Sequence, residues 1–139
     1  MRTMLSIRTA ADLRPAVVML RASRTRLADA VLDRGELTVP MECPDTANAE
    51  IAWTAPGASA GSVPVLEAQL KIRAVRTCTF DVERAGPAGR AALVYEPAAM
   101  TWTISDAQRS SITATVDALD ASIEMTDIEL GRQTLSSIM

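Results

Sequence analysis

The sequence predicts an α+β domain, in which an antiparallel sheet or meander with one long strand packs with an N-terminal and a C-terminal helix. Three observations lead to this prediction. Apolar residues recur with helical spacing between positions 13 and 34, side chains alternate over 66–83, and a second helical spacing follows Ser105. We assign residues 1–139 to a single domain, because this length is enough to bury a core without a metal or a disulfide framework.

The N-terminal third predicts a helix over residues 13–34. Residues 4–8 form either a short strand or part of an N-terminal arm over 1–12, and Asp12 then suits the N-cap, with Pro15 in the first turn. Gly35 stands where a glycine ends many helices. The β-branched pair within residues 16–20 leaves a strand as the alternative there. The apolar stripe of this helix would be Leu13, Val17, Leu20, Leu27 and Val31.

Short strands are expected at 36–41 and 50–55, and again at 90–97 and 100–105. A polar loop with Pro44 separates the first two strands, and the GPAG stretch at 86–89 predicts a turn before the second pair. Residues 56–64 are small and rich in glycine and proline, so we expect a flexible loop there.

The alternating segment 66–83 is much longer than an ordinary strand. A straight strand of this length would span roughly 60 Å, whereas a globule of this size is only about 30–40 Å across. The segment therefore either bends near Val75–Arg76 or projects as a β-arm that a neighbouring chain covers. Its apolar side would consist of Leu66, Ala68, Leu70, Ile72, Ala74, Cys78, Phe80 and Val82.

The segment 106–125 carries two conflicting signals. Ser105 and Gln108 fit a capping box, and the apolar residues that follow have 4–3–4 spacing, which favours a helix. The SITATVDA stretch also alternates, which leaves a strand as the alternative. Residues 126–139 are too apolar for a solubilising tail, so we predict that they dock on another surface.

Composition argues against several functional classes. The chain has no histidine, which disfavours histidine-based catalysis and metal binding. It also has few aromatic residues, which disfavours nucleic acid as a partner, because bases commonly stack on aromatic side chains. Residues 1–34 contain seven arginines and three aspartates, whereas residues 100–139 contain two arginines and six acidic residues. This uneven charge distribution indicates either that the two ends of the chain contact each other, within one molecule or between copies, or that they form two faces that are solvated independently.

No motif predicts a catalytic residue, a cofactor or a metal. If 106–125 is a helix, Asp117, Asp120, Glu124 and Asp127 form an acidic stripe, which we expect to be solvated or to pair with Arg21, Arg24 and Arg26. Ser59 lies within a G-x-S-x-G match but lacks the strand–helix context and the histidine that this motif requires. Whether Cys43 and Cys78 pair stays open.

The sequence shows no apolar segment of the kind that targets or spans membranes. The first residues lack the apolar core of a signal peptide, and nowhere do eighteen apolar residues run together. We therefore expect synthesis in the cytoplasm and no membrane partner.

These features predict a non-enzymatic structural or assembly subunit that forms a homo-oligomer and contacts other subunits of a larger assembly. Small, acidic, aromatic-poor chains with long hairpins and docking termini are similar in general character to tailed-phage virion proteins. We therefore expect a bacteriophage virion protein, such as a capsid decoration or cement protein, a connector or a tail subunit. The predicted interface consists of Leu70, Ile72, Phe80, Val82, Arg21, Arg24, Arg26, Trp102, Ile128, Leu130, Leu135 and Ile138.

Two alternatives belong to other classes. One is a small acidic cytoplasmic chaperone or adaptor that holds a client segment at its sheet edge. The other is an enzyme or small-ligand-binding protein with a pocket near Trp53 and Trp102.

Overall fold

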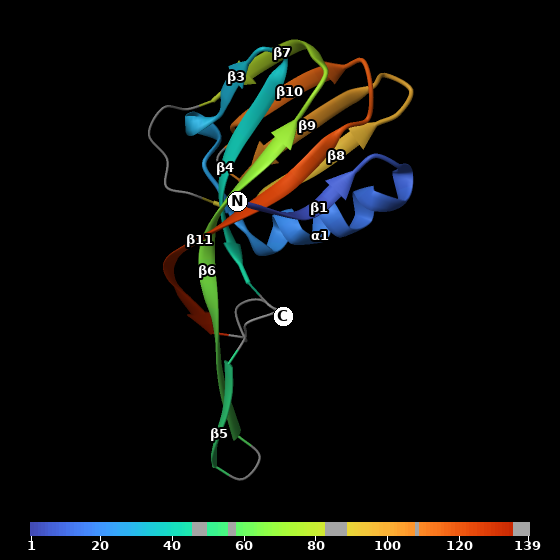
Figure 1. The fold of residues 1–139 in the computed structure, drawn as a ribbon. Helices are drawn as coiled ribbons and strands as arrows, with labels where there is room; N and C mark the ends of the chain where they lie inside the picture. The colour runs from blue at the N-terminus through green and yellow to red at the C-terminus, as the bar shows by residue number, and fades with distance from the viewer. Residues whose placement is uncertain (46–49, 56–57, 83–88, 108, 135–139) are drawn as a thin grey trace.

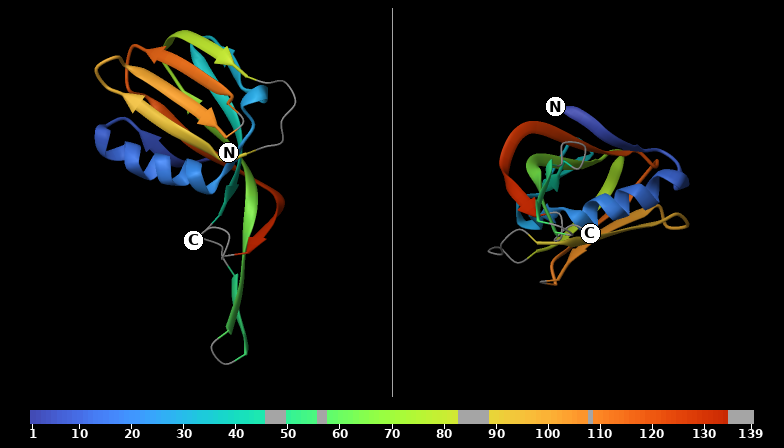
Figure 2. Two further views of the ribbon diagram at one scale, coloured as in Figure 1. Left: turned by 180° about the vertical axis from the view of Figure 1, so that it is seen from behind. Right: turned by 90° about the horizontal axis from the view of Figure 1, so that it is seen from below.

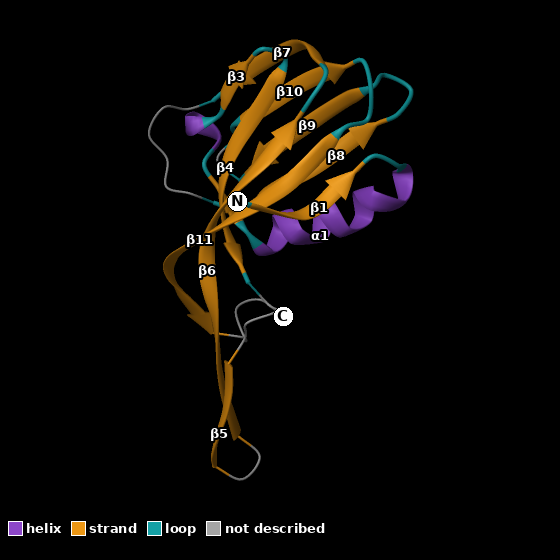
Figure 3. Cartoon of the chain, in the orientation of Figure 1, coloured by secondary structure: helices purple, strands orange, loops and turns teal. Residues whose placement is uncertain are grey.

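The described part of the chain forms two antiparallel β-sheets and one α-helix (Figure 1, Figure 3). The computed structural model describes residues 1–45, 50–55, 58–82, 89–107 and 109–134, with only the backbone described for 50–61 and 133–134. The helical elements are η1 (Ala10–Asp12), α1 (Leu13–Ala22) and η2 (Leu27–Asp29), of which η1 and η2 are 3-10 turns. The strands are β1 (Arg2–Ile7), β2 (Arg24–Thr25), β3 (Val31–Asp33), β4 (Glu36–Pro44), β5 (Glu50–Ala55), β6 (Ala58–Ile72), β7 (Val75–Asp81), β8 (Ala91–Glu96), β9 (Thr101–Asp106), β10 (Ser111–Val116) and β11 (Ala121–Thr134).

The α+β prediction with a helix near each end is therefore wrong. Within the described residues α1 is the only α-helix, and strands dominate the remainder. The larger sheet has the order β1-β11-β6-β4-β2, with β3 paired to β4 and β5 paired to β6. The smaller sheet has the order β7-β10-β9-β8.

The hydrophobic core lies between the two sheets, and α1 packs against β8 and β4 along one side of it (Figure 2). Alternation along each strand sends every second residue inward. In β4 these are Leu37, Val39, Met41 and Cys43, and in β6 they include Ala68, Leu70 and Ile72. The smaller sheet contributes Leu93, Trp102, Ile104, Ile112, Ala114 and Val116, and α1 contributes Ala16 and Leu20.

The predicted helix over 13–34 ends at Ala22. Arg24 and Thr25 pair with β4 instead, and residues 31–33 form β3 in a hairpin with the start of β4. Arg34 and Gly35 connect that hairpin with φ values of 51° and 75°, the positive values that a two-residue hairpin turn of type I′ requires. Gly35 is therefore a turn residue and does not end a helix.

The long segment 66–83 does not form one strand. β6 ends at Ile72, Ala74 has a φ of 57°, and β7 begins at Val75 in the other sheet. The Val75 N–H donates to the carbonyl of Gly35 at 2.9 Å, which fixes the corner between the sheets. The bend alternative near Val75–Arg76 therefore holds, and a projecting arm at this position does not.

A projecting ribbon does exist, but at the other end of β6. Residues 58–64, where the sequence predicts a flexible loop, belong to β6, and residues 58–62 pair with β5 in a ribbon that extends away from the sandwich (Figure 1). The expected strands near 36–41, 50–55, 90–97, 100–105 and 4–8 are all present.

The predicted helix over 106–125 is also wrong. Its residues form β10 and the start of β11, with Ile112, Ala114 and Val116 buried on one side of β10. The alternating pattern indicated the correct structure. The 4–3–4 spacing did not exclude a strand, because a spacing of four also places Ile112 and Val116 on the same side of a strand. Gln108 lies outside the described residues. Residues 126–134 of the predicted docking tail continue β11 and pair with β6, and 135–139 lie outside the described residues.

Candidate assembly surface

The outward side of the larger sheet is polar because β6 alternates. Glu67, Gln69, Lys71 and Arg73 are half-buried between fully or largely buried neighbours that face the core. Glu124 on β11 lies opposite Gln69 and joins the same outward row. This face therefore carries charges from three adjacent strands.

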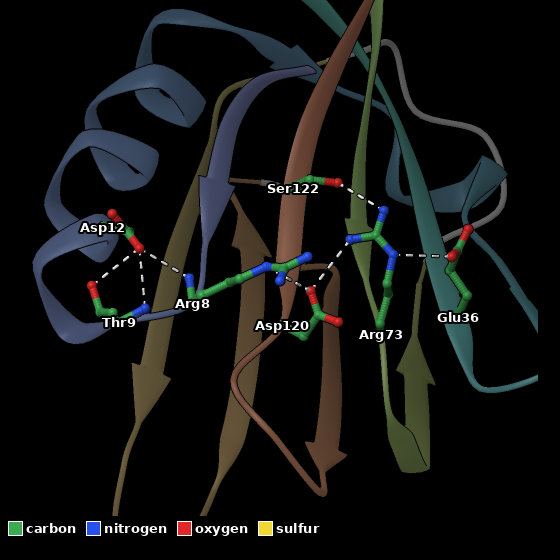
Figure 4. Close-up of polar contacts among 7 residues, drawn as sticks. All are labelled: Arg8, Thr9, Asp12, Glu36, Arg73, Asp120 and Ser122. Atoms are coloured by element: carbon green, nitrogen blue, oxygen red, sulfur yellow. Dashed lines mark hydrogen bonds and ion pairs between the residues drawn. The ribbon is translucent and has the colours of Figure 1, made fainter. Parts of the chain in front are cut away.

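Arg73 is the centre of an ion-pair network on this face (Figure 4). Its Nε lies 3.4 Å from Glu36 Oε2, and its Nη1 lies 3.5 Å from Asp120 Oδ1. Its Nη2 donates a hydrogen bond of 3.0 Å to Ser122 Oγ. Arg8 Nε lies 3.9 Å from the same Asp120 oxygen. The network thus joins β4, the β6–β7 corner, β11 and the residue that follows β1.

Lys71 extends the network toward the middle of the sheet. Its Nζ lies 2.8 Å from Glu124 Oε2 and 3.9 Å from Glu36 Oε1. Lys71 and Arg73 each lie close to one carboxylate of β4 and to one on or next to β11, and such pairs of opposite charge stabilise the strand pairing. Such a balanced row is an unsuitable site for a free anion or cation, and the described residues contain no cluster of metal-ligating side chains.

The predicted acidic stripe does not form. Asp120 and Glu124 belong to the network, and Asp117 lies 3.3 Å from Arg76 Nε at the corner between the sheets. These carboxylates pair with Arg8, Lys71, Arg73 and Arg76 rather than with the predicted Arg21, Arg24 and Arg26. The reason is the β structure of 111–125, which places Asp117 and Asp120 in the turn between β10 and β11, and Glu124 and Asp127 on β11.

The oppositely charged ends of the sequence meet within one molecule. β1 pairs antiparallel with β11, from Arg2 opposite Met125 to Ile7 opposite Ala121. Arg2 also donates a 3.0 Å hydrogen bond to the buried Asp45. The intramolecular alternative explains the charge asymmetry without a second copy.

Three of the predicted interface residues come together on the described surface. Arg24 and Arg26 precede β4 in the sequence, whereas Leu130 lies in the irregular part of β11. All three line one shallow hollow of about 160 Å³ with Glu42 and Glu67. Leu130, which lines this hollow, is 51% exposed to solvent, and Ile128, which lies two residues before it on β11, is 56% exposed.

The other predicted interface residues lie apart from this hollow. Leu70, Ile72 and Trp102 are fully buried in the core of the chain itself, and Trp102 packs on Tyr95 with ring centroids 4.8 Å apart. Phe80 on β7 is 43% exposed, Val82 is half-buried, and Arg21 is exposed at the end of α1. Leu135, Ile138 and the side chain of Trp53 lie outside the described residues.

The most conspicuous candidate surface is the β5–β6 ribbon, which the sequence reasoning missed. Residues 58–61 of β6 pair only with β5 among the described strands, in a register that places Ile51 opposite Gly61. The ribbon leaves the sandwich where Pro44 and Thr134 are the last paired residues of β4 and β11 (Figure 2). Pro56-Gly57 is a turn signal between two short apolar stretches and could have indicated this hairpin.

An apolar groove lies beside the base of the ribbon. It has a volume of about 700 Å³, and Pro15, Val18, Met19 and Ala22 of α1 line it together with Cys43 and Pro44 of β4. Val18 is 60% exposed although it lies on the helix next to this groove. Sequence periodicity could not find the groove, because its two walls come from elements that are distant in the sequence.

Both cysteines are free thiols. Burial raises the pKa of the Cys43 thiol, with a hydrogen bond from Ser23 acting in the opposite direction and the charge of Asp45 in the same direction. Burial also raises the pKa of Cys78. These shifts favour the neutral thiols and therefore disfavour a nucleophilic role.

Comparisons with protein-family models, with curated protein sequences and with solved structures found no significant match. None of the helices in the described part of the chain is long and apolar enough to cross a membrane.

Proposed function

We propose that this chain is a structural subunit that assembles with copies of itself through the β5–β6 ribbon. The observation that carries the proposal is the ribbon, in which residues 58–61 of β6 have no described neighbour other than β5. An isolated two-stranded hairpin is at best marginally stable in water. Its free edges and small residues therefore need a surface that covers them.

The composition of the ribbon supports contact with a protein. Between positions 50 and 62 the sequence has one charged residue, Glu50, and the remaining residues are apolar, small or hydroxylated. Exposed strands that remain unpaired usually carry charges or prolines that block association. The body of the chain, in contrast, pairs its charges within the larger sheet, as the network around Arg73 shows.

Within this class, the specific role that we propose is that of a bacteriophage virion protein, as a capsid decoration, connector or tail subunit. A ribbon that extends from one copy onto the next gives a head-to-tail contact, which produces rings or open helical arrays by repetition. Virion shells and tubes are built by such repetition. Support for this role comes from the ribbon, whose residues 58–61 of β6 pair only with β5 among the described strands.

The test compares the molar mass of the chain with that of a ribbon-shortened variant by light scattering over a wide concentration range. In the variant Asn-Gly replaces residues 51–61, so that Glu50 and Ser62, which lie opposite one another, are joined by a two-residue turn. The wild type is expected to form oligomers that grow with concentration, and the variant is expected to stay monomeric. Val94→Ser, which removes an exposed apolar residue of β8, is the matched control and should assemble normally.

A wild type that remains monomeric at every concentration would contradict the proposal. Capture of an added extended peptide by such a monomer would favour the chaperone or adaptor alternative. Closed rings or tubes in electron micrographs of the concentrated wild type would support the virion role, whereas a closed twofold dimer would contradict it.

A further inference from the structure

Among the residues that the structure describes, none covers the outer part of the β5–β6 ribbon or fills the apolar groove between α1 and β4. We infer that the β5–β6 ribbon of one copy docks in the α1–β4 groove of the next copy. This inference rests on the proposed function and adds to it the receptor surface.

The groove has the character that a weakly charged ribbon requires. Its walls are the apolar side chains of Pro15, Val18 and Met19 on one side and Cys43 and Pro44 on the other. The 60% exposure of Val18 leaves apolar surface in water that a docked strand would cover. A volume of about 700 Å³ is enough for several small side chains of a ribbon.

The charges of the two surfaces are complementary. Arg14 is the charged residue that lines the groove, and the described residues give it no ion-pair partner. Glu50 is the one charged residue between positions 50 and 62. Docking of the ribbon therefore brings one unpaired arginine to a segment whose single charge is negative.

The ribbon cannot fill the groove of its own chain. β6 runs without interruption from Ala58 to Ile72, and its inner half is held between β4 and β11. The six residues of β6 that precede Pro64, residues 58–63, therefore extend about 20 Å outward, away from α1 (Figure 1, Figure 2). A ribbon and a groove that cannot meet within one chain can meet only between two copies.

A mixed cross-linking experiment tests this contact. Two proteins are made in a Cys43→Ala, Cys78→Ala background, one with Val18→Cys in the groove and one with Ala52→Cys in the ribbon. Equal amounts are mixed under mild oxidation, and peptide mass spectrometry identifies the disulfides. The 18–52 disulfide is expected in at least tenfold excess over the 94–52 disulfide that the matched control Val94→Cys forms with Ala52→Cys.

A second measurement avoids the cysteine-free background, which removes a buried thiol. Val18→Glu in the otherwise unchanged chain is expected to weaken association at least tenfold, whereas Val94→Glu is expected to leave it unchanged. Equal association of these two variants would overturn the inference.

The outcomes separate the inference from the proposed function. If oligomers form but the 18–52 disulfide is no more abundant than the 94–52 disulfide, the ribbon docks elsewhere and only the inference fails. If the wild type does not associate at all, both fail.

Discussion

Arg73 and Asp120 are joined twice at the end of the larger sheet. The backbone N–H of Arg73 donates to the carbonyl of Asp120 at 2.9 Å, and the guanidinium Nη1 lies 3.5 Å from the carboxylate Oδ1. The side-chain ion pair therefore reinforces a contact between the end of β6 and the start of β11 that a backbone hydrogen bond already forms.

This pair is expected to contribute modestly to stability. Both side chains are about one-third exposed, so a double-mutant cycle with Arg73→Met and Asp120→Asn should give a coupling energy of about 0.5–1 kcal/mol. The measurement is the free energy of urea unfolding, and the coupling should fall in 1 M NaCl. The Arg76–Asp117 pair, whose side chains are 66% and 65% exposed, is the control and should show almost none.

The corner at Ala74 predicts an unusual stabilising substitution. Ala74 has a φ of 57°, a conformation that costs an L-residue about 1–2 kcal/mol and costs glycine almost nothing. Ala74→Gly should therefore raise the free energy of unfolding by about 0.5–1 kcal/mol. Ala92→Gly, at an exposed position within β8, should lower it by a similar amount. A loss of stability in Ala74→Gly would contradict the corner between β6 and β7.

Two residues of the long alternating segment should respond differently to truncation. Leu70 is fully buried, whereas Phe80 is 43% exposed. Leu70→Ala is expected to cost about 2–5 kcal/mol of unfolding free energy, and Phe80→Ala less than about 1 kcal/mol. Thermal and urea unfolding of the two variants measure this difference, and equal losses would argue against the described core.

The strands could be predicted better than their arrangement. Period-two patterns located β4, β8 and β9 because one side of each faces the core and the other faces solvent. The helix prediction over 13–34 failed after Ala22 because Leu27 and Val31 continue the helical spacing while lying in a 3-10 turn and a strand. A periodic pattern of five apolar positions cannot distinguish one continuous helix from a short helix that is followed by a turn and a strand.

The candidate site was less predictable than the strands. Arg24, Arg26 and Leu130 were predicted separately, and only strand pairing brings them to one hollow. The ribbon was missed because Ala, Gly and Ser between positions 57 and 62 are typical of loops, and cross-strand pairing with β5 overrides that preference.

Asp12 predicts a pH dependence of stability. Its carboxylate accepts hydrogen bonds from the backbone N–H groups of Arg8 and Thr9 and from the Thr9 hydroxyl, and these bonds lower its pKa in that order of importance. A lowered folded pKa gives stability above the unfolded value of about 3.9, which is lost as the pH falls through the folded pKa.

Asp12→Asn should therefore lower the urea midpoint at pH 7, and its difference from the wild type should shrink as the pH falls from 5 to 2. Asp127→Asn, at an exposed position of β11, provides the comparison. A difference that stays constant down to pH 2 would contradict the assigned hydrogen bonds.

The raised thiol pKa values predict slow modification of both cysteines in the native chain. In a Cys78→Ala variant, Cys43 is 2% exposed and should react with Ellman's reagent at pH 8 at least a hundredfold more slowly than glutathione. Denaturation in urea should restore rapid reaction. Rapid reaction without denaturant would show that β4 and the adjoining groove open readily.

Hydrogen exchange of the ribbon amides tests the central claim most directly. Exchange of residues 50–62 is followed by mass spectrometry at protein concentrations from below to above the onset of association. If the ribbon is covered by a second copy, its protection should rise at least tenfold with concentration while that of β9 and β10 stays constant. Ribbon amides that exchange equally fast at every concentration, in a sample shown to be oligomeric, would contradict assembly through the ribbon.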